Sequence, residues 1–248
     1  MKIKPWLQDY IHIISWLNML DRNIHKTILL QILKDIYTDT SLGPILGFKG
    51  GTAANFFYDL GRFSVDLDFD LLDETKVDFI FEKLEKILRE YGTIKEKYKK
   101  QNTLFFILSY DEKAQNIKVE INRRNFGSRY ALKNYLGISM LVMVKEDMFA
   151  HKLVTMLERS KIANRDVYDI WHFLKNLWPI NKEIVEKRTK MNFREYLKKC
   201  IKFVDSLNDR NILSGMGELL DEKQKIWAKN HLKKDTTFLL KVRLEQEK

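Results

Sequence analysis

Apolar residues recur at different spacings along the chain, and these spacings divide it into helical and strand-rich regions. Between Trp6 and Tyr37 they recur every three or four residues, which predicts two helices broken near Asp21–Asn23. The same spacing dominates from Lys145 to the C-terminus, whereas the intervening residues alternate or form short apolar runs typical of strands. We therefore predict an α/β (α+β) fold, with a small mixed sheet and N-terminal helices in residues 1–144 and a helical bundle in residues 145–248.

The strictest alternation runs from Arg62 to Asp70, where Arg, Ser and three Asp residues alternate with four apolar ones. Successive side chains of a strand point to opposite faces, so one face packs on a core and the other carries carboxylates. Carboxylates two residues apart, about 7 Å at the Cα, can share a cation that offsets their repulsion. An exposed, merely soluble edge strand is the alternative, but aspartate is a poor strand former. We favour a metal-binding or catalytic role for Asp66 and Asp68, and expect Asp70 at the strand end.

A glycine pair precedes this strand. Gly50 and Gly51 follow an apolar run, and Thr52 is the predicted N-cap of a helix over residues 53–60 that ends at Gly61. A strand, a glycine turn and a helix N-terminus together present backbone N–H groups to phosphate. Most glycine pairs only make turns. Beside an acidic strand, this one predicts phosphate at the helix end and divalent cations on the carboxylates.

Further elements follow in order. We predict a helix over residues 76–91, a β-hairpin over residues 103–121, and a short strand in the run ISMLVMV within the otherwise unassigned residues 125–144. Glu120 lies between two apolar residues of the second hairpin strand and shares its polar face with Lys118 and Asn122. A lone glutamate on a strand is usually just solvated. The predicted C-terminal helices span residues 146–159, 165–176, 182–190, 193–207, 216–228 and 236–247.

Composition narrows the class of protein. Lysine and arginine outnumber aspartate and glutamate by 44 to 34, a formal charge of +10 that favours polyanionic partners such as RNA, DNA or nucleotides. A lysine-rich composition can also reflect only the base composition of a genome. The single cysteine, Cys200, cannot form an internal disulfide and is expected in the core. No apolar run approaches the length of a membrane span, so we expect a soluble, cytoplasmic protein with no membrane partner.

The motifs together resemble a known family. The glycine pair followed by Arg62-x-Ser64-x-Asp66-x-Asp68 is similar to the signature of polymerase-beta-type nucleotidyltransferases, and more closely to that of the AbiEii/AbiGii toxin family of abortive-infection and toxin–antitoxin systems. VEI around Glu120 is similar to the setting of that fold's third carboxylate. The resemblance extends over roughly residues 45–175 through two further matches: Asp147 and Lys152 to the acid-x4-Lys motif, and Arg165, Asp166 and Asp169 to the RDxxD motif.

The resemblance implies transfer of a nucleoside monophosphate from an NTP to an acceptor hydroxyl, in an active site between the two domains. Asp66 and Asp68 would hold two Mg²⁺ ions, and Glu120 would act as general base or help hold the second metal. The residues implied in nucleotide or phosphate binding are Gly50, Gly51, Thr52, Arg62, Ser64, Lys152, Arg165 and Asp169. Asp166 would support Lys152, and Asp166 or Asp169 would orient that lysine or the nucleobase.

The resemblance also implies a toxin of a two-gene system, with an antitoxin encoded nearby and RNA, specifically tRNA, as the acceptor. One alternative is a transferase acting on a small molecule, with a compact acidic or aromatic acceptor pocket. A second is a non-catalytic nucleotide- or protein-binding member, although both paired aspartates are present. A weaker third is metal-dependent hydrolysis, which usually draws on histidine-rich ligand clusters that the chain lacks.

Overall fold

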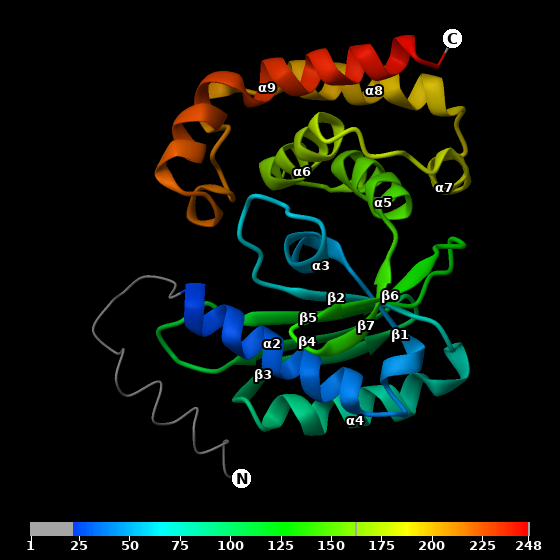
Figure 1. The fold of residues 1–248 in the computed structure, drawn as a ribbon, viewed down its shortest axis with the longest axis vertical. Helices are drawn as coiled ribbons and strands as arrows, with labels where there is room; N and C mark the ends of the chain where they lie inside the picture. Colours follow the sequence, from blue (N-terminus) through cyan, green and yellow to red (C-terminus); the bar gives the residue numbers. More distant parts are fainter. Residues whose placement is uncertain (1–21, 162, 248) are drawn as a thin grey trace. The chain divides into compact units, whose positions relative to one another are not determined.

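The computed structural model describes residues 22–161 and 163–247 (Figure 1). These residues form two compact units. The first comprises the described residues up to Phe57 together with 64–125 and 130–142, and the second comprises 58–63, 126–129 and the residues from Met143 onward. The first of the two helices predicted between Trp6 and Tyr37 lies outside the described residues.

The first unit is built on a seven-stranded mixed sheet, which confirms the predicted α/β class. The strand order is β3-β4-β5-β2-β1-β7-β6, with β2–β5 and β1–β7 parallel and β1–β2, β3–β4 and β4–β5 antiparallel. The strands are β1 Leu46–Lys49, β2 Leu67–Leu71, β3 Thr93–Lys100, β4 Thr103–Ser109, β5 Ile117–Asn122, β6 Tyr130–Tyr135 and β7 Ile138–Met143. The hairpin β4–β5 and the strand β7 were both predicted.

Helices cover the two faces of this sheet differently. Figure 1 shows α2 (Arg22–Thr38) and α4 (Val77–Arg89) on one side and α3 (Gly50–Phe57) on the other. Ring contacts of Tyr37 in α2 with Phe69, and of Phe81 in α4 with Phe106, identify the face of β2 and β4 that forms the core. Because side chains alternate along a strand, the aspartates of β2 belong to the opposite face.

The second unit is helical. It contains α5 Lys145–Glu158, α6 Asn164–Lys175, α7 Lys182–Thr189, α8 Phe193–Ser206 and α9 Glu222–Glu245. The first four agree with the predicted helices. The two helices predicted at 216–228 and 236–247 are wrong as separate elements, because one continuous helix spans most of this stretch. An Asp221–Gln224 capping box starts α9, and Ala228, Leu232 and Leu240 continue one buried stripe along it.

The stretch before Leu67 differs from the predicted strand. Hydrogen-bonded pairing begins only at Leu67, although Val65, Leu67 and Phe69 are all buried as the alternation predicted. The helix α3 begins at Gly50 and ends at Phe57, so Thr52 lies inside it rather than at its N-cap. Asp59 adopts the left-handed conformation that we predicted for Gly61, with φ of 57°.

Two single residues also bear on the sequence analysis. Cys200 is buried, as predicted, and burial raises the pKa of its thiol. His25 is fully buried, with Nδ1 2.9 Å from the Tyr110 hydroxyl and Nε2 3.0 Å from the Val65 carbonyl oxygen. Within residues 22–161 and 163–247, the helices are too short or too polar to cross a membrane.

Candidate active site

Three carboxylates meet on one face of the sheet in the first unit. Asp68 of β2 lies directly opposite Glu120 of the parallel neighbour β5, and Asp66 precedes Asp68 by two residues. Residues in register on adjacent strands project to the same face, and Asp66, which lies just before β2, joins them through a shared contact with Lys118. The side chains of Asp66, Asp68 and Glu120 are 18%, 28% and 37% exposed. The fold therefore brings together the three residues that the sequence singled out.

A lysine lies among these carboxylates. The Lys118 Nζ is 3.1 Å from Glu120 Oε2 and 3.9 Å from both Asp66 Oδ2 and Asp68 Oδ1. Burial alone would lower the pKa of Lys118, but the charges of Asp68, Asp66 and Glu120 raise it above its ordinary value. Lys118 thus carries a permanent positive charge close to all three carboxylates.

The donor chemistry of this group suits a hard divalent cation. All three side chains offer carboxylate oxygens, the ligands that magnesium prefers, and an ammonium group already occupies a position near each of them. Among the residues that the structure describes, no three His, Cys, Asp or Glu side chains are gathered tightly enough to hold a metal as they stand. The group fits magnesium in charge and ligand type, and binding would require the side chains to close around the ion.

The glycine pair lies against the acidic strand. Gly50 has φ of +79°, and a Cβ built on it would lie 2.4 Å from Asp68 Oδ2, so both conformation and space require glycine there. The Thr52 hydroxyl donates to the Asp66 carbonyl oxygen, which fixes the chain just before β2. Gly50, Gly51 and Thr52 form the first turn of α3, whose N–H groups have no partners within the helix.

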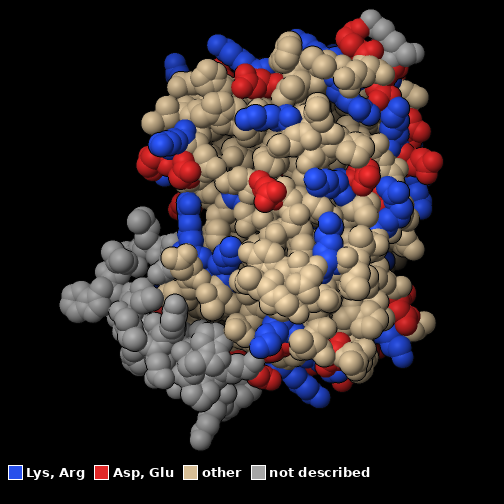
Figure 2. Space-filling view, viewed as in Figure 1, with Lys and Arg blue, Asp and Glu red and all other residues tan. Residues whose placement is uncertain are grey.

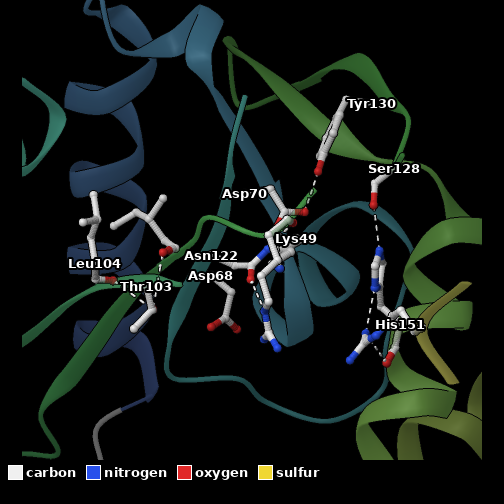
Figure 3. A network of polar contacts seen from close by, with 12 residues as sticks. Lys49, Asp68, Asp70, Thr103, Leu104, Asn122, Ser128, Tyr130 and His151 are labelled. Atoms are coloured by element: carbon white, nitrogen blue, oxygen red, sulfur yellow. Dashed lines mark hydrogen bonds and ion pairs between the residues drawn. The ribbon is translucent and has the colours of Figure 1, made fainter. Parts of the chain in front are cut away.

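The third aspartate has a different environment. Asp70 is buried and accepts hydrogen bonds from Lys49 Nζ at 2.6 Å, Asn122 Nδ2 at 2.6 Å and the Tyr130 hydroxyl at 2.5 Å (Figure 3). Burial would raise the pKa of Asp70, but Lys49, Tyr130 and Asn122 together lower it. Asp70 thus joins β1, β5 and β6 in a fixed network rather than completing the open acidic group.

A second charged cluster lies within the second unit, where Lys152 of α5 faces two aspartates of α6. Its Nζ is 2.9 Å from Asp166 Oδ1 and 3.0 Å from Asp169 Oδ2. Arg62 donates from Nε at 2.5 Å and from a terminal nitrogen at 2.7 Å to the two oxygens of Asp169. Arg159 Nε lies 2.7 Å from Asp166 Oδ2. Lys152 of the acid-x4-Lys motif therefore meets both aspartates of the RDxxD motif in one ion-pair network.

This network is almost closed to solvent. Arg62 is 3% exposed and Asp169 is fully buried, while Lys152 keeps 15% of its side chain exposed. Burial would lower the pKa of Lys152, but the charges of Asp166 and Asp169 raise it. Burial would likewise raise the pKa of Asp166, but Lys152 and Arg159 lower it. Lys152 is charged and held in place, and part of its side chain remains exposed.

The remaining motif residues have separate environments. Asp147 accepts hydrogen bonds from the Arg129 backbone and guanidinium and from Asn181 Nδ2. It therefore links α5 to Arg129 and Asn181 and does not pair with Lys152. Arg165 and Ser64 are half-buried. Burial raises the pKa of Asp166, Lys152 and Arg159 lower it, and the charge of Arg165 lowers it further by a smaller amount.

His151, beside Lys152 in sequence, contacts Ser128 and Arg188 (Figure 3). An arginine nitrogen only donates, so the His151 Nδ1, 2.8 Å from Arg188, is the acceptor. Nε2 then carries the proton and donates to the Ser128 oxygen at 2.7 Å. This arrangement cannot take a proton from Ser128, so the pair is not a nucleophile and base.

Two participants were missed at the level of sequence. The sequence shows that Lys118 lies on the same face of its strand as Glu120. Its approach to Asp66 and Asp68, however, depends on the register between β2 and β5. Arg159 follows the end of α5 and reaches Asp166 only through the packing of α5 on α6. Neither contact has a local sequence signal.

Comparisons with known proteins bear on the family and the fold of the chain. The family described as nucleotidyl transferase AbiEii toxin, type IV toxin–antitoxin system, matches residues 31–239. A Helicobacter pylori protein described as a candidate nucleotidyltransferase has a similar fold, with a TM-score of 0.56 at 18% identity over 90% of this chain and 96% of its own. JHP933 from Helicobacter pylori has a TM-score of 0.55 at 18% identity over 92% of this chain and 96% of its own. No curated protein matches the chain significantly.

The match to the family covers both charged clusters and most of the described helices and strands. The two solved structures, at 18% identity, bear on the fold alone. The chain belongs to the AbiEii family of nucleotidyl transferase toxins of type IV toxin–antitoxin systems.

Proposed function

We propose that this nucleotidyltransferase transfers a nucleoside monophosphate from an NTP to a hydroxyl group of RNA, with tRNA as the acceptor, in a magnesium-dependent reaction. The observation that carries the proposal is the group of three half-exposed carboxylates around the Lys118 ammonium. These carboxylates carry more negative charge than Lys118 can neutralise. They lie on the sheet face that carries α3, within reach of a ligand.

The carboxylates have distinct roles in this proposal. Asp66 and Asp68 hold two magnesium ions, which when bound supply charge stabilisation at the attacking and leaving oxygens. Glu120 is the most exposed of the three, at 37%, and accepts the proton of the acceptor hydroxyl. Gly50 keeps the backbone close to Asp68, because any larger residue would displace that carboxylate.

The phosphates of the NTP bind at the first turn of α3. The backbone N–H groups of Gly50, Gly51 and Thr52 are available for this because the helix does not pair them. The Thr52 hydroxyl is already engaged with Asp66, so its backbone rather than its side chain serves the nucleotide. Ser64, which is half-buried, is assigned to a further phosphate contact.

Lys152 neutralises charge on a phosphate of the nucleotide, with Arg165 as a further cation. Asp166 and Asp169 position the Lys152 ammonium from two sides. Arg62, which is almost fully buried and engaged with both oxygens of Asp169, acts through that aspartate rather than on phosphate directly. The contacts within the second unit support the positioning roles of these aspartates.

The acceptor and the partner rest on composition and family. The chain carries a formal charge of +10, which suits a polyanionic acceptor. Figure 2 shows lysine and arginine side chains spread over the visible face and interspersed with acidic ones, so the charge does not itself mark an RNA path. Membership in a type IV toxin–antitoxin family implies an antitoxin as partner.

The test is incubation of the purified protein with each radiolabelled NTP, magnesium and total cellular RNA. The active-site variant is Asp66→Ala/Asp68→Ala, and the matched control is Asp78→Asn, which removes an exposed carboxylate of α4. We expect label on a tRNA-sized band with the wild type and with the control, and none with the double variant or without magnesium.

Three outcomes would contradict parts of the proposal. Label that persists in the double variant would exclude the carboxylate mechanism. Label on a protein or small molecule but on no RNA would exclude the acceptor class. Unchanged transfer after chelation of divalent cations, followed in the same assay, would exclude the metal requirement.

A further inference from the structure

A pair of stacked aromatic side chains lies on the same sheet face as the carboxylates. We infer that Tyr98 of β3 and Phe105 of β4 form a platform on which the terminal base of the acceptor RNA stacks. This inference rests on the proposed function, because it assigns a binding site to the RNA acceptor of that reaction.

The strand register places the pair in line with the carboxylates. Tyr98 pairs with Phe105, Phe105 with Glu120, and Glu120 with Asp68. Residues directly opposite one another on neighbouring strands project their side chains to the same face. One row of side chains therefore runs across four strands, from the aromatic pair to the acidic group.

The opposite face of β3 contacts α4. Lys97 pairs with Glu85 of α4 at 2.7 Å, and Lys99 pairs with Asp78 of the same helix. Tyr98, between these two lysines, points the other way because side chains alternate. The alternation that anchors β3 on α4 is thus what turns Tyr98 toward the carboxylate face.

The two rings stack on each other and are nearly parallel. Their centroids are 4.6 Å apart with an interplanar angle of 11°, and both residues are only half-buried. Lys100 Nζ lies 4.3 Å from the centroid of the Tyr98 ring. Half-exposed aromatic side chains beside a cation are the usual means of binding single-stranded RNA, because every base has a π-face and every nucleotide a phosphate.

The position of the pair favours the acceptor over the NTP. The first turn of α3, where the NTP phosphates are assigned, follows β1, whereas the aromatic pair lies beyond Glu120 on the β4–β3 side. Neighbouring strands are about 4.8 Å apart, so Phe105 lies one strand and Tyr98 two strands from Glu120. A nucleotide whose hydroxyl meets Glu120 can therefore place its base over these rings.

Direct binding tests this platform independently of transfer. A 5′-fluorescent RNA oligonucleotide that ends in a normal 3′ nucleotide is compared with the same RNA ending in an abasic nucleotide, by anisotropy without NTP or magnesium. The variants are Tyr98→Leu and Phe105→Leu, with Tyr98→Phe as the conservative change. The control is Phe79→Leu, an exposed aromatic residue of α4.

We expect the wild type to bind the normal end about 5- to 100-fold more tightly than the abasic end. Tyr98→Leu and Phe105→Leu should lose most of this preference, whereas Tyr98→Phe and Phe79→Leu should retain it. In transfer assays the leucine variants should raise KM for RNA by a similar factor and leave KM for the NTP unchanged.

The outcomes separate this inference from the proposed function. Equal binding of the two RNA ends by the wild type, or a preference that survives both leucine variants, overturns the platform. A raised KM for the NTP with an unchanged KM for RNA overturns its assignment to the acceptor. Base-dependent binding lost in the leucine variants, together with no transfer to RNA, supports the platform and overturns the proposed function alone.

Discussion

Two clusters of carboxylates and cations, one in each unit, are built from the same chemical groups and differ in exposure. In the first unit, Asp66, Asp68 and Glu120 are 18–37% exposed around Lys118. In the second, Asp166 and Asp169 are at most 1% exposed. They contact the cations Lys152, Arg62 and Arg159.

The balance of charge differs as well. Three carboxylates face one ammonium in the first cluster, and three cations face two carboxylates in the second. An open cluster with surplus negative charge is suited to bind a cation from solution. A buried, internally paired cluster is suited to hold one of its own side chains, here Lys152, in a fixed position. The same substitution should therefore affect activity in one cluster and stability in the other.

The largest effect should come from Asp68→Asn in the open cluster. It removes one negative charge next to Gly50 and Glu120, so transfer should fall by at least about 10³-fold. The free energy of unfolding should stay unchanged or rise, because repulsion among carboxylates is relieved. Steady-state kinetics and urea unfolding measure the two quantities on the same preparation. A strongly destabilised Asp68→Asn protein would remove the distinction between the clusters.

Asp169→Asn in the buried cluster should act on stability. The change leaves Arg62 and Lys152 short of a carboxylate in a buried environment, so the free energy of unfolding should fall by about 3–5 kcal/mol. The control is Asp209→Asn, whose exposed carboxylate lies 3.8 Å from Lys233 in the same unit, with an expected cost under about 1 kcal/mol. Equal costs for the two variants in urea unfolding would contradict a buried, interdependent network.

The pH dependence of stability should sharpen the contrast. Burial raises the pKa of Asp166, but Lys152 and Arg159 lower it by more, so the folded-state pKa lies below its ordinary value of 3.8. Its contribution is therefore complete above pH ~4 and is lost as the pH falls through the folded pKa, by up to about 1.4 kcal/mol per pH unit. The stability gap between wild type and Asp166→Asn should be constant from pH 8 to 5 and narrow below pH 4. A gap that closes between pH 7 and 6 would indicate a raised pKa instead.

The smallest effect should come from Lys118→Met. This change removes the ammonium group that competes with an added cation, so magnesium should bind about two- to fivefold more tightly. The shift of the melting temperature on titration with magnesium reports this without any need for activity. Lys113→Met, an exposed loop change, is the control. Weaker magnesium binding by Lys118→Met would mean that the lysine supports the cation site.

The sequence predicted those parts of the site that depend on local periodicity. The period-two pattern placed Asp66 and Asp68 on one face because burial of Val65, Leu67 and Phe69 enforces it. The pattern overstated the strand, which begins only at Leu67, and Arg62 pairs instead with Asp169, 107 residues later. The role of Asp70 was invisible for the same reason, since its partner Asn122 is 52 residues away.

The helical half shows the same limit. The predicted break between residues 228 and 236 coincides with a mostly polar run, KNHLKKD, that contains no glycine or proline. The apolar stripe on α9 continues through Leu232 and Leu240, and its packing against α6 and α8 outweighs local polarity. Contacts of Trp227 with Trp171, at 3.9 Å between ring centroids, could not be inferred from either segment alone.

The separation of Arg62 from Asp169 has a consequence for synthesis of the protein. At 5–20 residues per second, Arg62 is synthesised roughly 5–20 s before its carboxylate partner, 107 residues later. Residues 126–129 also belong to the second unit, and Arg129 precedes its partner Asp147 by 18 residues. During translation the first unit therefore acquires its strands while it carries two short segments that remain unpaired until the C-terminal helices emerge. A nascent chain stalled before residue 169 would expose a guanidinium group that the finished protein buries.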